Sequence, residues 1–279
     1  MIQMGFQDET RAAIAIVLGE IQVSIDRMVY PELDAYIAIW FAHKDSTVDL
    51  TELSNAMMKC DRTEILPKPV VDFIVPNYEA AAEVGDLDAM FNLGELYFTG
   101  RCGKQSYEKA IMWYTKAHEE GSPKSTEKLG NYYYFGYGVH PDYEKAYRFF
   151  SKCEMLGWAN SLFMIGDMFR YGQFVEHDEN MAFRMYKEAF NALDDELKST
   201  MGAEAFRRLA DCYYEGIGTD RNYLTALSLY QSAERYYYVK MMDHTTFELS
   251  DLESVLKSEE NCRNRIVENL HKELYEYYN

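Results

Sequence analysis

Three glycines, Gly85, Gly121 and Gly157, follow one another at intervals of 36 residues, and the same residue types recur after each of them. Counted from each glycine, a small residue comes at position four, an aliphatic residue and a glycine at eight and nine, an aromatic residue at twelve and another glycine at fifteen. The three series are Ala89, Leu93-Gly94, Tyr97 and Gly100; Ser125, Leu129-Gly130, Tyr133 and Gly136; and Ser161, Ile165-Gly166, Phe169 and Gly172. A fourth series follows an eight-residue insertion, with Ala205, Leu209-Ala210, Tyr213, Gly216 and Gly218. A fixed period of this length is typical of a chain built from stacked supersecondary units.

Each unit is predicted to be a pair of helices. Residues about four apart share one helix face, and the glycines after each first helix permit the positive φ of a turn. A second helix is predicted to begin at Tyr107, Tyr143 and Tyr223, each followed three residues later by an alanine. A glycine inside a helix costs about 1 kcal/mol relative to alanine, so the recurring glycine of the first helix indicates close helix–helix contact. Because one hairpin cannot bury its apolar face alone, the copies are expected to stack.

This order of residues resembles the Sel-1-like repeat, a relative of the tetratricopeptide repeat. The best copies are Asp86–Gly121 and Ser122–Gly157, and the resemblance covers residues 78–234. The copies depart from the pattern at Gly100-Arg101-Cys102-Gly103, at Gly172-Gln173-Phe174 and at Ala210, which stands in place of the helix glycine. The resemblance implies an all-α fold, a right-handed α-solenoid of helix–turn–helix repeats with helical caps.

The flanking segments carry no clear repeat. Residues 1–77 are predicted to form a helical cap or small helical module, in which Ile14–Met28 has a helical stripe. The stretch Leu66–Pro76 contains three prolines and is interpreted as an extended connector. Residues 235–279 are predicted to form closing helices with two apolar stripes, Phe247 to Leu256 and Ile266 to Leu274, and with Ser258 as the cap of the second.

Composition narrows the choice of partner and compartment. The formal net charge is −18, which argues against a nucleic-acid backbone or an anionic membrane as partner, because both attract a basic face. The longest apolar runs, such as Ala12–Leu18, have seven residues, far fewer than the roughly 18 of a membrane span. The five cysteines are an odd number without a Cys-x-x-Cys pair, and the first residues carry no basic segment typical of a signal peptide. We therefore expect a cytoplasmic protein.

The sequence offers no arrangement of residues typical of catalysis. The six histidines are scattered without metal-ligand spacing, and neither a Gly-x-Ser-x-Gly elbow nor a phosphate-binding loop is present. We expect no catalytic residue, no metal and no cofactor. A hydrolase-like activity, with which some members of the resembled family have been credited, is kept as a minor alternative.

The candidate site is a groove. In related helical-hairpin solenoids the first helix of each repeat lines the concave face, and its residues outside the apolar stripe face the groove. Equivalent places hold an acid or amide, with aromatic residues nearby: Glu95, Asn131, Asp167 and Asp211. The full set of predicted groove residues is Asp88, Phe91, Glu95, Phe98, Asn131, Tyr134, Asn160, Phe163, Asp167, Arg170, Arg207, Asp211 and Tyr214. The competing interpretation is that the aromatics pack between repeats and the acids are solvated.

These residues predict an adaptor or scaffold that binds a protein or peptide. An acidic groove with aromatic side chains suits a segment carrying Lys or Arg, through cation–π contacts and charge-assisted hydrogen bonds. Capture of a carboxylate is disfavoured, because Glu95, Asp167 and Asp211 occupy places where tetratricopeptide grooves use Lys and Asn. A second hypothesis is a neutralising partner of a basic protein such as a toxin. The oligomeric state stays open.

Overall fold

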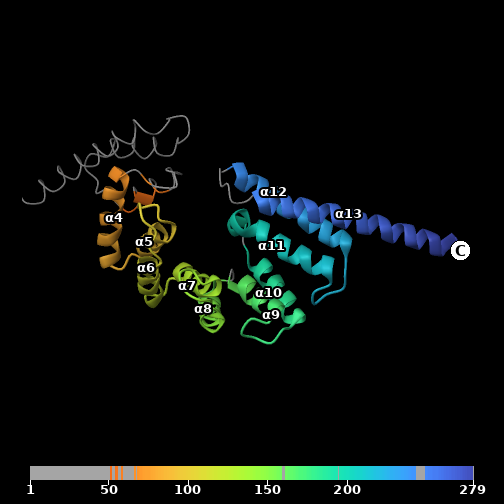
Figure 1. Ribbon diagram of the computed structural model, residues 1–279, viewed down its shortest axis with the longest axis horizontal. Coiled ribbons are helices and arrows are strands. Elements are labelled where there is room, and N and C mark those ends of the chain that lie inside the picture. Colours follow the sequence, from red (N-terminus) through yellow and green to blue (C-terminus); the bar gives the residue numbers. More distant parts are fainter. Residues whose placement is uncertain are drawn as a thin grey trace, which may run out of the picture. The chain divides into compact units, whose positions relative to one another are not determined.

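A computed structural model of the chain describes residues 51, 54, 55, 58, 66, 68–158, 161–193, 195–242 and 249–278. Every regular element among these residues is an α-helix, so the all-α expectation is confirmed for this part of the chain (Figure 1). The helices divide into two compact units, Met1–Leu129 and Gly130–Asn279, and each unit is considered by itself. The helical stripe expected over Ile14–Met28 lies outside the described residues.

The helices follow the order of the repeats. The four hairpins are α5 (Leu87–Thr99) with α6 (Tyr107–Glu119), α7 (Pro123–Phe135) with α8 (Tyr143–Met155), α9 (Ser161–Tyr171) with α10 (Glu179–Ala192), and α11 (Asp195–Glu215) with α12 (Tyr223–Met242). In the sequence they follow α4 (Lys68–Glu83) and precede α13 (Leu249–Tyr278), and the border between the two units falls within α7. The predicted helix starts at Tyr107, Tyr143 and Tyr223 are confirmed.

Short polar side chains begin most of these helices. The carboxylates of Asp86, Asp142 and Asp178 accept hydrogen bonds of 2.9–3.0 Å from the backbone N–H three residues later. Ser106 and Asn222 do the same for α6 and α12. Each side chain satisfies one of the N–H groups that a helix leaves without a partner in its first turn. The helix boundaries are therefore fixed by local chemistry.

The glycine inside each first helix packs against an aromatic ring of the second. A Cβ added at Gly94 would lie 2.3 Å from the Tyr114 ring, one at Gly130 would lie 2.4 Å from the Phe150 ring, and one at Gly166 would lie 2.5 Å from Tyr186. Ordinary carbon contacts are 3.5–4.0 Å, so a side chain at any of these positions would have to displace the ring or the helix. The close contact predicted from the recurring glycine is confirmed.

The expected connector over Leu66–Pro76 is wrong from residue 68 onwards, because α4 begins at Lys68 and contains Pro76 in its interior. Pro69 lies in the first turn, where its missing N–H removes no helical hydrogen bond. Pro76 does remove one, at a cost of about 3 kcal/mol. Ile74 and Tyr78 on either side of Pro76 are fully buried against α5, and this burial offsets the cost.

The C-terminal segment also differs from its prediction. In place of two helices with Ser258 as a cap, α13 is one continuous helix of 30 residues, and the Ser258 hydroxyl donates to the Ser254 carbonyl inside it. Its first half buries Leu252 and Val255 against α12, whereas Leu270 and Leu274 farther on are about half exposed. Phe247 lies outside the described residues.

Candidate functional site

The acid at the recurring groove position has an internal partner in three of the four repeats. The hydroxyl of Tyr114 donates to Glu95, that of Tyr186 to Asp167 at 2.6 Å, and that of Tyr230 to Asp211 at 2.6 Å, always across 19 residues. The second repeat has Asn131 at this position, and the residue 19 positions later is Phe150, which has no hydroxyl. Each of these acids therefore accepts a hydrogen bond from a tyrosine of its own repeat. The acid occurs where the residue 19 positions later is a tyrosine, and this correlation is visible in the sequence.

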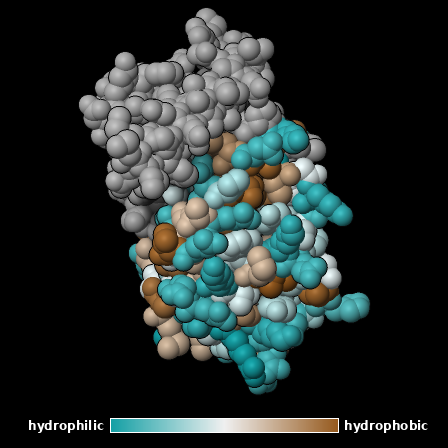
Figure 2. All heavy atoms as spheres, turned by 90° about the vertical axis from the view of Figure 1, so that its left-hand side faces the viewer, coloured by the Kyte–Doolittle hydropathy of each residue, from teal (hydrophilic) through white to brown (hydrophobic). Residues whose placement is uncertain are grey.

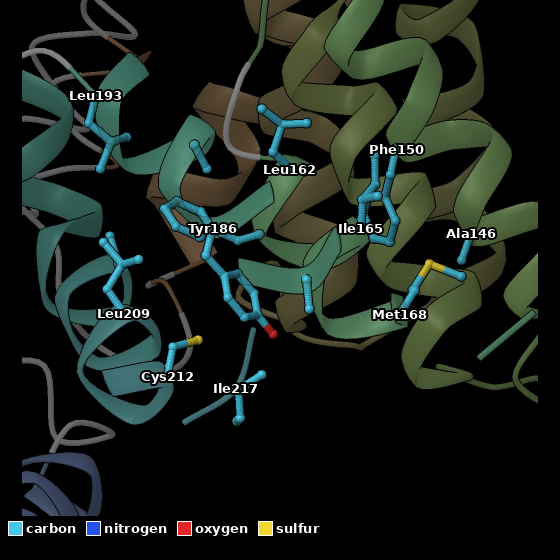
Figure 3. Packing of buried hydrophobic residues seen from close by; sticks show 14 residues of the cluster. Ala146, Phe150, Leu162, Ile165, Met168, Tyr186, Leu193, Leu209, Cys212 and Ile217 are labelled. Atoms are coloured by element: carbon cyan, nitrogen blue, oxygen red, sulfur yellow. The ribbon is translucent and has the colours of Figure 1, made fainter. Parts of the chain in front are cut away.

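These tyrosines remain hydrogen-bond donors throughout the ordinary pH range. Burial raises the pKa of Tyr114, Tyr186 and Tyr230, and the neighbouring carboxylate raises it further. Figure 3 shows the Tyr186 ring between Leu162 and Ile165 on one side and Leu209 and Cys212 on the other. A protonated hydroxyl at the end of such a ring gives each first helix one fixed polar contact to the second helix.

In the unit of residues 130–279 an arginine network ties the third and fourth repeats together. Arg208 binds the carboxylate of Asp167 at 2.9 Å and that of Glu204 at 2.8 Å. Arg207 binds Glu204 at 2.9 Å and Asp211 at 3.2 Å. Burial alone would raise the pKa of Glu204, but the pairing with Arg207 and Arg208 and the Tyr237 hydroxyl lower it to about 2.

Two of the predicted contact residues in this unit are not accessible to a partner. Phe163 is 4% exposed and Asp167 is 9% exposed, and the guanidinium of Arg208 lies 5.9 Å from the Phe163 ring. The sequence prediction did not include Arg208, although its spacing of four residues from Glu204 is a recognisable ion-pair signal. These side chains stabilise the stack of repeats.

The other predicted residues of this unit are partly exposed. Arg170 binds Glu215 at 2.7 Å and lies 3.8 Å from Asp211. The ring of Tyr134 lies 5.5 Å from Tyr143, that of Tyr214 lies 5.5 Å from Tyr223, and Asn131 is half-buried. Burial raises the pKa of Tyr134 to about 12. Asn160 lies outside the described residues.

In the unit that ends at Leu129, three predicted residues line one cavity of about 470 Å³, namely Asp88, Phe91 and Glu95. The other described lining residues are Asn55, Met58, Asn92, Thr99, Arg101 and Lys124. The Asn55 side-chain oxygen accepts from Tyr78 at 2.8 Å and from Asn92 at 2.7 Å. Phe98, at the end of the same helix, packs on Tyr107 with ring centroids 5.4 Å apart. The volume of the cavity falls within the range of about 300–1,000 Å³ that is typical of ligand pockets in proteins.

Two lysines of the same chain form ion pairs with the acids of this cavity. Lys124 binds Asp88 at 3.1 Å, and Lys128 binds Glu95 at 2.9 Å. Both ammonium groups lie 5.8–5.9 Å from the centroid of the Phe91 ring. The sequence predicts that the cation of a basic partner binds an acid beside an aromatic face. In this structure the chain's own lysines take that place.

The remaining observations concern surface hydropathy, metal ligands and membrane-spanning helices. On the face drawn in Figure 2, hydrophilic residues dominate the coloured area, and hydrophobic residues are scattered among them. Within the part of the chain that the structure describes, no three His, Cys, Asp or Glu side chains come close enough to hold a metal ion. None of the helices described has both the length and the apolar character needed to cross a membrane.

Comparison with known proteins agrees with this architecture. A sequence profile of the family described as Sel1 repeat matches residues 87–122, 123–157, 159–192 and 203–235. The putative sel1-like repeat-containing protein L18 of Acanthamoeba polyphaga mimivirus is 39% identical over 46 residues, which make up 16% of this chain and only 8% of that protein.

Solved structures are also similar. The crystal structure of a Sel1 repeat protein from Oxalobacter formigenes superposes with a TM-score of 0.58 at 21% identity, over 82% of this chain and 93% of that one. The protective antigen c5321 of uropathogenic Escherichia coli gives a TM-score of 0.49 at 20% identity, over 88% of this chain and 56% of that one. The first likeness shows a shared helical-repeat fold.

Proposed function

Because this chain belongs to the Sel1-repeat family, we propose that it is a non-catalytic adaptor or scaffold that binds a peptide or protein segment on the first helices of its repeats. Proteins built from this repeat generally act through protein–protein interaction. The observation that carries the proposal for this chain is the cavity beside Asp88, Phe91 and Glu95, where exposed charge and an aromatic face meet.

The partner segment proposed for this cavity carries a Lys or Arg side chain. The Asp88–Lys124 pair is exposed, with half to two thirds of each side chain in contact with solvent, and such pairs contribute only about 0–1 kcal/mol. An incoming cation can take the place of Lys124 against Asp88 and Phe91 with little net loss. Arginine suits this exchange better than lysine, because its planar guanidinium pairs with a carboxylate through two hydrogen bonds and stacks on a ring.

Contact residues and supporting residues have different roles in this proposal. Asp88 and Phe91 contact the partner directly, and Glu95 does so from the cavity wall while it holds the Tyr114 hydroxyl. Asp167 and Phe163 support the fold, since they are buried and already bound. Substitution of the supporting residues is therefore a poor test of binding, because the fold would change as well.

The test is a binding assay on the full chain with a library of labelled twelve-residue peptides that carry a central Arg, Lys or Gln in otherwise identical sequences. Asp88→Lys and Phe91→Ala are compared with the wild type and with Glu119→Lys, a control that makes the same charge change on an exposed position of α6. We expect Arg peptides to bind wild type and Glu119→Lys alike, and to bind the two cavity variants at least about tenfold more weakly, the factor that corresponds to 1.4 kcal/mol. Equal binding of Arg and Gln peptides, or equal binding by all four proteins, would contradict the proposal.

The net charge favours a second candidate, a neutralising partner of a basic protein. A complex driven by the overall charge forms quickly and weakens steeply with added salt. A complex anchored on Phe91 depends much less on ionic strength. Measuring the affinity of a captured partner between low and physiological salt distinguishes the two candidates.

A further inference from the structure

The cavity on α5 differs in charge from the chain as a whole. The full sequence has 46 acidic and 28 basic residues. The described residues that line the cavity include two of each sign, with Asp88 and Glu95 opposed to Arg101 and Lys124. A further cation, Lys128, binds Glu95 at 2.9 Å. In this described part of the chain, three cations therefore share two carboxylates, although the protein is strongly acidic.

The two ion pairs that join α5 to α7 are not equally open to a partner. In the first pair, the side chains of Asp88 and Lys124 are 67% and 49% exposed. In the second pair, the side chains of Glu95 and Lys128 are 25% and 34% exposed, and Glu95 also accepts the hydroxyl of Tyr114. The pair that an incoming cation can open is therefore Asp88–Lys124.

Opening this pair leaves a lysine whose charge has to be compensated. The ammonium groups of Lys124 and Lys128 both lie within 5.9 Å of the centroid of the Phe91 ring. An Arg side chain placed on Asp88 and Phe91 brings one more positive charge to the same ring. Like charges at such separations repel, because they lie within about one Debye length of 8–10 Å. A partner that supplies only a cation therefore makes the cavity more positive, whereas a partner that also supplies a carboxylate restores the balance.

We propose that the segment bound in this cavity carries an Asp or Glu two residues away from its Arg, and that this acid pairs with Lys124 once the Arg has taken Asp88. The inference rests on the proposed function, because it concerns the same partner. Lys124 stays attached to α7, so its flexible four-carbon stem moves the ammonium group by only a few Å. In an extended segment, residues two apart project on the same side at a separation of about 6.6 Å. The exchange then replaces one exposed ion pair by two.

The test uses the full chain and labelled twelve-residue peptides that differ at three central positions of an otherwise uncharged sequence. We expect the peptide with Arg-Ala-Glu to bind the wild type about fivefold more tightly than the peptide with Arg-Ala-Gln, the upper end of what an exposed ion pair contributes. The peptide with Arg-Glu-Ala should show no such gain, because its acid projects on the opposite side of an extended chain. The peptide with Gln-Ala-Glu should bind no better than one with Gln-Ala-Gln, since Lys124 stays paired with Asp88.

The variant Lys124→Gln assigns the gain to one side chain. Its amide no longer neutralises Asp88 and no longer attracts the acid of the peptide. We therefore expect this variant to bind the Arg-Ala-Gln peptide at least as tightly as the wild type does, and to bind the Arg-Ala-Glu peptide no better than that. The control Lys116→Gln removes the same charge from an exposed position of α6 and should keep the fivefold difference.

The outcomes separate this inference from the proposed function. If no Arg peptide binds the wild type more tightly than the Gln-Ala-Gln peptide, the proposed function fails and the inference fails with it. If Arg peptides bind but the acid adds nothing, adds as much in Arg-Glu-Ala, or is still preferred by Lys124→Gln, the proposed function stands and the inference is overturned.

Discussion

Replacement of Gly166 by alanine tests whether ring contact determines the repeated helix glycine. The new Cβ would lie 2.5 Å from one carbon of the Tyr186 ring and 2.7 Å from the next. Since ordinary carbon contacts begin near 3.5 Å, the ring or the helix must move by about 1 Å. Tyr186 is fully buried, and its hydroxyl holds Asp167, which in turn binds Arg208. The displacement would therefore strain a hydrogen bond as well as the packing.

The expected cost follows from three contributions. Overpacking of a dense core costs about 1–3 kcal/mol, and weakening the Tyr186–Asp167 hydrogen bond costs about 1 kcal/mol more. Alanine gains about 1 kcal/mol over glycine in helix propensity. We expect Gly166→Ala to lower the free energy of unfolding by about 2 kcal/mol.

The assay is urea unfolding followed by circular dichroism, with Gly202→Ala as the matched control. Gly202 also lies inside a helix, but a Cβ there would be 3.3 Å from the Tyr236 ring, a much smaller overlap, so Gly202→Ala should lose clearly less stability than Gly166→Ala. Equal stability of Gly166→Ala and the wild type would refute the reasoning, because the glycine would then have a cause other than the ring.

Three further predictions concern the turns, the hydroxyl contacts and acid stability. Gly218→Ala should cost about 2–4 kcal/mol, because φ is +60° and the Cβ would lie 2.2 Å from the Glu179 carbonyl; Gly157→Ala, with φ of +80° but open space around it, should lose only about 1 kcal/mol in the same unfolding assay. Tyr186→Phe should lower the free energy of unfolding by about 1–2 kcal/mol, since Asp167 keeps Arg208 as a partner. Glu204 has its pKa lowered from the ordinary 4.5 to about 2 in the fold, so its stabilisation is present above the unfolded pKa and is lost as the pH falls towards 2. In acid titrations followed by circular dichroism, Glu204→Gln should flatten this loss, and a loss as steep as that of the wild type would contradict the assignment.

The repeat and its local chemistry could be predicted from the sequence because they depend on neighbours within one hairpin. Spacings of about four residues place the apolar face, and a tyrosine or phenylalanine 20 residues after each helix glycine supplies the ring on which that glycine packs. Helix caps act over three residues. All these signals recur, so each copy supports the interpretation of the others.

The polar side of the candidate site was harder to predict. Glu95, Asp167 and Asp211 were correctly placed on the first helices, but their tyrosine partners across 19 residues were not recognised. The lysines at Asp88 and Glu95 come from the next repeat. Such pairings depend on how successive hairpins stack, which a pattern within one repeat does not encode.

What the sequence alone determined is the number of hairpins, the starts of their second helices and the close helix–helix contact at the recurring glycine. What only the tertiary structure decided is the path of the flanking segments and the burial of polar groups. Pro76 is held inside α4 because Ile74 and Tyr78 are buried against α5, and Glu259 lies at a helix–helix contact because α13 continues through Ser258 without a break. In both cases burial against a distant segment outweighs a local preference, since the free energy of removing apolar side chains from water exceeds that of a single cap or turn.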